Sequence, residues 1–137
     1  MIRDIDHIAV VVKSIEEKIP FYVDVMGFHM KCIETVEHMH VRVAMLTSAS
    51  GTTHVELVEP ITPDSGVARF LQKKGEAIHH LCYLVDDLQG ELTRLESLGT
   101  KLIDRTPRVG EGGSLVAFLH PDANHGVLVE LKELKKD

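Results

Sequence analysis

The stretch GEAIHHLCYLV, Gly75 to Val85, places two histidines side by side at the start of an apolar run. A β-strand turns successive side chains to opposite faces, so His79 and His80 face different surroundings. If one of these imidazoles is a ligand or a base, we expect the other to be structural. The rest of the sequence is needed to tell the two apart.

Upstream of this stretch, the sequence predicts one strand, one helix and three further strands. The alternating, β-branched run at 5–12 predicts a strand. A helix is predicted over 14–27, begun by a capping box of Ser14 and Glu17 and kinked by Pro20. Three strand-like runs and a short helix follow, at 29–34, 40–48, 53–60 and 62–75.

The second half of the chain repeats this order. Residues 78–85 predict a strand, and 86–99 predict a helix that stops at Gly99. Three more strand-like runs follow, at 100–105, 113–120 and 125–133. The repeated β-α-β-β-β order predicts an α+β fold of two tandem βαβββ modules, about 4–61 and 77–134, within a single domain over 1–137.

Two histidines and two glutamates occupy matching places in the two modules. His7 and His80 lie in the first strands, and Glu56 and Glu130 lie in the last strands, 49 and 50 positions further on. If the modules pack with pseudo-twofold symmetry, the four side chains converge. Two imidazoles and two carboxylates suit a divalent transition metal with positions left open for water or substrate.

Histidine and glutamate also occur in strands without any functional role. A single strand histidine or glutamate is more often satisfied or solvated than functional, so the joint repeat of four residues carries the prediction. Glu59 and Glu133, three residues beyond the proposed ligands, are predicted to face water. The remaining strand histidines, with the wrong face or an edge position, are predicted to be structural or exposed: His29, His38, His40, His54 and His79.

Composition excludes several other classes of protein. The 137 residues contain 15 Lys and Arg against 21 Asp and Glu, a net charge of −6, which makes nucleic acid a poor partner. The longest apolar stretch, Ile8 to Val12, is far too short to span a membrane. The start MIRDIDHI has no apolar signal region, so we expect a cytoplasmic protein. Cys32 and Cys82 lie outside any CxxC motif and are predicted to be small core residues.

Several segments carry a family resemblance. DHIAVVV, FYVDVMGF, VELVEP, PRVGEGGSLVAFLHP and HGVLVELKE, in this order, resemble the vicinal oxygen chelate superfamily, which includes glyoxalase I, extradiol dioxygenases and methylmalonyl-CoA epimerase. The epimerase family is the closest match. The resemblance covers Ile5 to Glu133.

This resemblance implies one incomplete, barrel-like mixed β-sheet around a metal site. By position, the family's metal ligands fall on His7, Glu56, His80 and Glu130, so His80 is the expected ligand and His79 its neighbour. The expected cofactor is a divalent ion, cobalt first, with nickel, manganese or zinc as alternatives. The implied reaction interconverts (2R)- and (2S)-methylmalonyl-CoA by α-proton abstraction through a metal-stabilised enolate. The implied partners are an acyl-CoA substrate and a second copy in a homodimer.

Glu130 is the expected ligand-side base, and the second acid or base stays open. Some relatives carry a glutamate where this chain has Val43, which leaves Glu37, His38 or a metal-bound water as weak candidates. Two other functions on the same scaffold are a glyoxalase I-like isomerase and a non-catalytic small-molecule-binding protein. The ending HPDANHGVLVELKE favours the epimerase over the glyoxalase, and the four ligand-type residues disfavour a metal-free protein.

Overall fold

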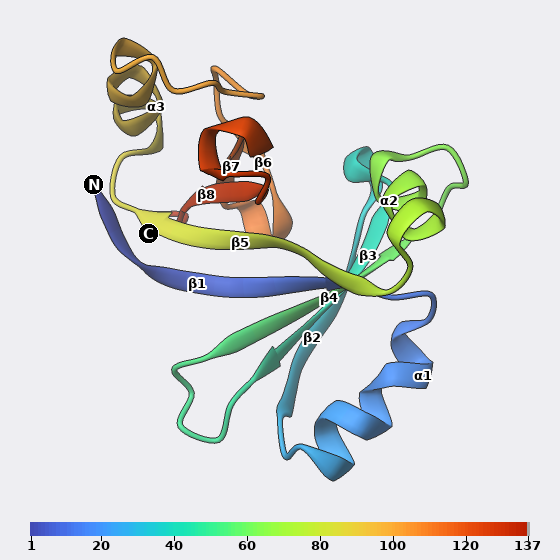
Figure 1. The fold of residues 1–137 in the computed structure, drawn as a ribbon. Helices are drawn as coiled ribbons and strands as arrows, with labels where there is room; N and C mark the ends of the chain where they lie inside the picture. Colours follow the sequence, from blue (N-terminus) through green and yellow to red (C-terminus); the bar gives the residue numbers. More distant parts are fainter. Residues whose placement is uncertain (137) are drawn as a thin grey trace. The chain divides into compact units, whose positions relative to one another are not determined.

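The computed structural model describes residues 1–136, and Asp137 lies outside the described residues. The chain divides into two compact units. Unit 1 comprises Met1–Asp6 and the residues from His80 onward, and unit 2 comprises His7–His79. The strands β1 (Ile2–Val11) and β5 (Ala77–Val85), which Figure 1 shows as long continuous strands, each pass from one unit to the other. The single domain over 1–137 stays a prediction.

Unit 2 contains the strand order β2-β3-β4-β1. β2 (His29–Val36), β3 (Val41–Thr47) and β4 (His54–Pro60) pair antiparallel, whereas β1 and β4 pair parallel. A helix, α1 (Ile15–Pro20), packs on one face of this sheet through a cluster that includes Val12, Ile15, Ala44, Leu46 and Leu57. The other face carries Ala9, Val11, Val43 and Val58, against which Phe70 and Leu71 of α2 (Gly66–Lys74) pack.

Unit 1 repeats the pattern with the order β5-β8-β7-β6. β5 and β8 (Val129–Glu133) pair parallel, and β7 (Leu115–Leu119) pairs antiparallel with β8 and with the short β6 (Arg108–Val109). The helix α3 (Leu88–Ser97) packs on one face through Leu88 and Leu92, which contact Val85, Ala117, Val129 and Leu131. The predicted α+β fold of two repeated modules is confirmed.

Two predicted elements differ from the structure because local hydrogen bonding overrides the pattern. The first helix is α-helical only to Pro20, which lacks an N–H group, and continues as a π-helical turn over Phe21–Val25, where Met26 N donates to Phe21 O at 2.9 Å. The strand predicted at 100–105 is reduced to a single bridge between Leu102 and Leu119. There the amides of Ile103 and Asp104 both donate to Phe118 O, which interrupts the ladder.

The cysteine predictions are half right. Cys82 is fully buried in β5, as expected for a small core residue. Cys32 is exposed, so its prediction as a core residue was wrong, because it lies on β2 at the end of the strand order, where few neighbours cover it. None of the helices within residues 1–136 has the length and apolar character that crossing a membrane requires.

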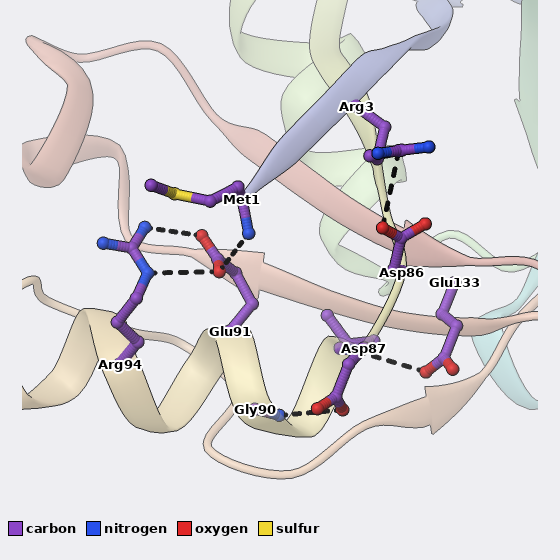
Figure 2. Close-up of polar contacts among 9 residues, drawn as sticks. Met1, Arg3, Asp86, Asp87, Gly90, Glu91, Arg94 and Glu133 are labelled. Atoms are coloured by element: carbon purple, nitrogen blue, oxygen red, sulfur yellow. Dashed lines mark hydrogen bonds and ion pairs between the residues drawn. The ribbon is translucent and has the colours of Figure 1, made fainter.

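A buried carboxylate ties α3 to the start of the chain in unit 1. Glu91 accepts hydrogen bonds from the Met1 ammonium at 2.7 Å and from Arg94 at 2.7 and 3.2 Å, as the dashed lines in Figure 2 show. The hydrogen bonds from Arg94 outweigh the effect of burial and lower the pKa of Glu91 from 4.5 to about 2. The same helix begins at Asp87, whose Oδ1 accepts from Gly90 N at 3.0 Å.

We expect Glu91→Gln to lower the free energy of unfolding by about 1–3 kcal/mol at pH 7, because a charge-assisted pair is lost. Since the folded-state pKa is the lower one, this contribution is complete above pH 4.5 and disappears as the pH falls through 2. Urea unfolding between pH 2 and 7 measures it. The control is Glu96→Gln, whose exposed pair with Arg105 should contribute less than about 0.5 kcal/mol. Equal losses for the two variants, or a loss independent of pH, would refute the assignment.

Candidate metal and active site

One histidine and one glutamate lie together in unit 2. In the parallel ladder of β1 and β4, Glu56 is the register partner of Ala9, and His7 is two residues before Ala9 on the same face. His7 Nε2 and Glu56 Oε2 are 3.6 Å apart. His7 and Glu56 are only 2% and 7% exposed, so both polar groups lie in the interior of the unit.

Unit 1 contains the same arrangement at equivalent positions. Glu130 of β8 is the register partner of Cys82, and His80 is two residues before Cys82 on β5. His80 Nε2 and Glu130 Oε1 are 3.2 Å apart, and both residues are buried. The register therefore matches that of unit 2 residue for residue, and His7 and His80 lie within β1 and β5, the first strands of the two modules, as predicted.

These pairs have the chemistry and the spacing of metal ligands. Imidazole nitrogen and carboxylate oxygen bind divalent transition ions at about 2.0–2.2 Å, so two such atoms on one ion are separated by about 3.0–3.5 Å. The separation of 3.2 Å in unit 1 lies within that range, and the separation of 3.6 Å in unit 2 lies just above it. A buried carboxylate also requires a compensating charge, which a cation beside each pair would provide. The two pairs are therefore candidate ligands of a divalent metal.

The prediction that Glu59 and Glu133 face water was wrong. Glu59 Oε2 accepts a hydrogen bond from Ile15 N, the first residue of α1, at 2.8 Å. Glu133 Oε2 accepts one from Leu88 N, the first residue of α3, at 3.1 Å, as drawn in Figure 2. In each unit, the glutamate three residues after the candidate ligand therefore accepts a hydrogen bond from the first amide of a helix. This helix is α1 in unit 2 and α3 in unit 1. A negative charge at a helix N-terminus satisfies otherwise unpaired N–H groups and interacts favourably with the helix dipole.

The other histidines occupy different environments. His79 lies in unit 2, where its ring packs edge-on against Phe70 with the ring centroids 4.8 Å apart. His29, His38 and His40 are exposed, and His54 is half-buried. The adjacent histidines therefore have different surroundings, as the alternation of a strand predicts: His79 packs on Phe70, and His80 lies beside Glu130.

The candidates for a second acid or base are poorly placed. Val43 is buried in an apolar cluster with Val41 and Val58, so this position provides no proton-transfer group. Glu37 and His38 lie on the exposed 3-10 turn Glu37–Met39 between β2 and β3.

A buried lysine was missed by the sequence analysis. Lys132 is 7% exposed, and its Nζ lies 3.1 Å from Asp6 Oδ2 and 3.4 Å from Glu111 Oε1. Burial by itself lowers the pKa of Lys132, but the nearby carboxylates of Asp6 and Glu111 outweigh it and hold the pKa above its usual range. The available signal was its place two residues after Glu130 on a strand, which puts both side chains on one face.

The fold and these buried pairs agree with one family. The model of the glyoxalase/bleomycin resistance protein/dioxygenase superfamily matches residues 6–118, and the chain belongs to that superfamily.

Within it, the chain is similar to methylmalonyl-CoA epimerases, as the sequence resemblance predicted. It is 43% identical over 133 residues to the protein YqjC of Bacillus subtilis (strain 168), covering 97% of this chain and 94% of YqjC. It is 32% identical over 136 residues to the ethylmalonyl-CoA/methylmalonyl-CoA epimerase of Cereibacter sphaeroides, covering 98% of this chain and all of that enzyme. A solved structure of a Streptomyces coelicolor methylmalonyl-CoA epimerase variant in complex with 2-nitronate-propionyl-CoA matches with a TM-score of 0.92 and 32% identity, over 99% of this chain and 100% of that one.

We expect Glu133→Ala to lower the free energy of unfolding by about 1–2 kcal/mol, because Leu88 N, the first amide of α3, loses its acceptor while the Asp87 cap remains. Chemical unfolding followed by circular dichroism measures the loss. The matched control is Glu37→Ala on the exposed 3-10 turn, with an expected change within about 0.5 kcal/mol. A Glu133 variant as stable as this control would show that the cap does not stabilise α3.

Proposed function

We propose that this enzyme interconverts the (2R) and (2S) epimers of methylmalonyl-CoA, or of a close 2-alkyl analogue, by moving the α-proton. The proposal includes one divalent ion held by His7, Glu56, His80 and Glu130. The observation that carries it is the occurrence of the same buried His–Glu pair, in the same ladder register, in both units. The similarity to epimerases over almost the whole chain supports the choice of substrate.

The reacting carbon of such a substrate lies between a thioester carbonyl and a carboxylate, which makes its proton acidic. Glu130 removes this proton, and the electron pair of the C–H bond passes into an enolate. A carboxylate has two oxygen atoms, so one glutamate can hold a cation and also accept a proton. When bound, a divalent cation stabilises the negative charge that develops on the substrate oxygens, which contributes several kcal/mol.

Epimerisation also requires a proton to return to the opposite face of the same carbon. A single carboxylate on one face returns the proton where it came from, so a second proton-transfer group is needed. The apolar surroundings of Val43, Val41 and Val58 provide none. Cobalt as the preferred ion, the homodimer and the cytoplasmic location stay predictions.

The test is deuterium incorporation at C2 of both methylmalonyl-CoA epimers in D₂O, with metal-stripped protein and after Co²⁺ addition. We expect exchange only with metal. We further expect His80→Ala to weaken Co²⁺ binding more than about 100-fold, since even the loss of a ligand's hydrogen-bond partner costs roughly 10–100-fold.

His79→Ala is the matched control, because it removes the neighbouring imidazole, which packs on Phe70. We expect this variant to bind Co²⁺ and to exchange the proton as the wild-type protein does. A folded, metal-loaded wild-type protein that exchanges neither epimer would refute the epimerase. Equal effects of the two substitutions on Co²⁺ binding would refute the ligand set.

A further inference from the structure

Unit 1 contains a buried acidic oxygen in the side chain of Glu111. Glu111 Oε2 is inaccessible to solvent and has no hydrogen-bond partner among residues 1–136. Leaving a buried carboxyl oxygen unsatisfied costs about 1–3 kcal/mol or more, and such groups are rare in folded proteins. A proton on this oxygen, or a ligand group beside it, would remove that cost.

The Glu111 carboxyl group belongs to the same face of unit 1 as Glu130. Its Oε1 lies 3.4 Å from Lys132 Nζ, and Lys132 follows Glu130 by two residues on β8. Alternate residues of a strand share a face, with Cα atoms about 7 Å apart. A proton-transfer group must come within about 3 Å of the reacting carbon. Lys132 connects the Glu111 carboxyl group to the face of β8 that carries Glu130.

The backbone around Glu111 is fixed by packing and hydrogen bonds. Ser114 Oγ donates to Glu111 O at 2.8 Å, and Gly110 N donates to Ser114 O at 2.8 Å. A Cβ atom at Gly110 would lie 2.9 Å from Val116 Cγ1, so only glycine allows this approach. Val116 is the register partner of Lys132, which places the Glu111 turn at the level of Lys132 in the sheet. The backbone that carries the Glu111 side chain is therefore held in place, and the ion pair with Lys132 orients its carboxyl group.

Among the acidic groups around Lys132, the contacts favour Glu111 over Asp6. Asp6 lies 3.1 Å from Lys132 Nζ and immediately precedes the candidate ligand His7 in the chain. Glu111 has one oxygen beside Lys132 and a second, buried oxygen that no described group satisfies. Oε2 is the oxygen that can carry a transferable proton, because Oε1 lies beside the Lys132 ammonium.

We propose that Glu111 is the second proton-transfer group of the epimerase reaction, an inference that rests on the proposed function. Glu130 takes the α-proton of one epimer, and the C–H electron pair forms the enolate. Glu111, as a carboxylic acid, then gives its proton to the opposite face of C2, where the enolate pair forms the new C–H bond. The resulting Glu111 carboxylate is stabilised by the Lys132 ammonium. In the reverse direction the two glutamates exchange roles.

Glu111→Gln separates this role from a structural one. In D₂O, we expect the variant to exchange the α-proton of one epimer within a few-fold of the wild-type rate, because Glu130 is unchanged. Exchange of the other epimer and net epimerisation should fall by about 10²–10⁴-fold. Glu111→Asp, which keeps a carboxyl group, should restore part of the lost exchange. Circular dichroism and urea unfolding establish that the variants are folded.

Two controls use other carboxylates of unit 1. Asp6→Asn removes the other partner of Lys132, and we expect it to affect the exchange of both epimers alike. Glu96→Gln, on an exposed helix position, should leave both exchange rates unchanged. A folded Glu111→Gln protein that loses both exchanges equally, or that epimerises like the wild type, would overturn the proposal. Failure of the wild-type protein to exchange either epimer would instead overturn the proposed function.

Discussion

Burying a carboxylate beside an imidazole inside a β-sheet requires compensating charge and fixed geometry, and both units of this protein are built around that requirement. Glu56 and Glu130 reach their histidines only because the first and last strands of each module are parallel neighbours. Parallel neighbours cannot be joined by a tight turn, so a long crossover connection must lie between them. The βαβββ order, with its helix on the opposite face of the sheet, provides that connection and covers the apolar side of the strands that carry the pairs.

The two modules carry the same residues at the His–Glu pairs but different residues beside these pairs. In unit 2, the residue two positions after Glu56 is Val58, which packs with Val43 and the residues of α2. In unit 1, the equivalent residue is Lys132, which holds two carboxylates. The His–Glu pair of unit 2 therefore has an apolar neighbour on its strand, and the pair of unit 1 has a charged one.

The sequence predicted what depends on local pattern and on the repeat. Alternation predicted the strands, Ser14 caps α1 as expected, and the matching positions in the two halves predicted His–Glu pairs whose atoms lie 3.6 and 3.2 Å apart. It did not predict contacts between distant residues with no pattern of their own. Glu59 and Glu133 accept hydrogen bonds from helix amides 44 and 45 positions away in the chain. Lys132 lies in a lysine-rich C-terminal segment, where the sequence pattern does not distinguish a buried lysine from an exposed one. The shortened strand at Leu102 results from two amides that share Phe118 O, and the π-helical turn after Pro20 results from the hydrogen bond of Met26 N to Phe21 O, neither of which has a sequence pattern of its own.

The helix caps at Glu59 and Glu133 also bear on how such a chain could arise. Each module contains a histidine, a glutamate and, three residues later, the carboxylate that holds its own helix. Each module therefore supplies both its own His–Glu pair and the acceptor for the first amide of its own helix. Once such a module is duplicated, the two copies can change independently at other positions, and Val58 and Lys132 occupy equivalent positions in the two modules.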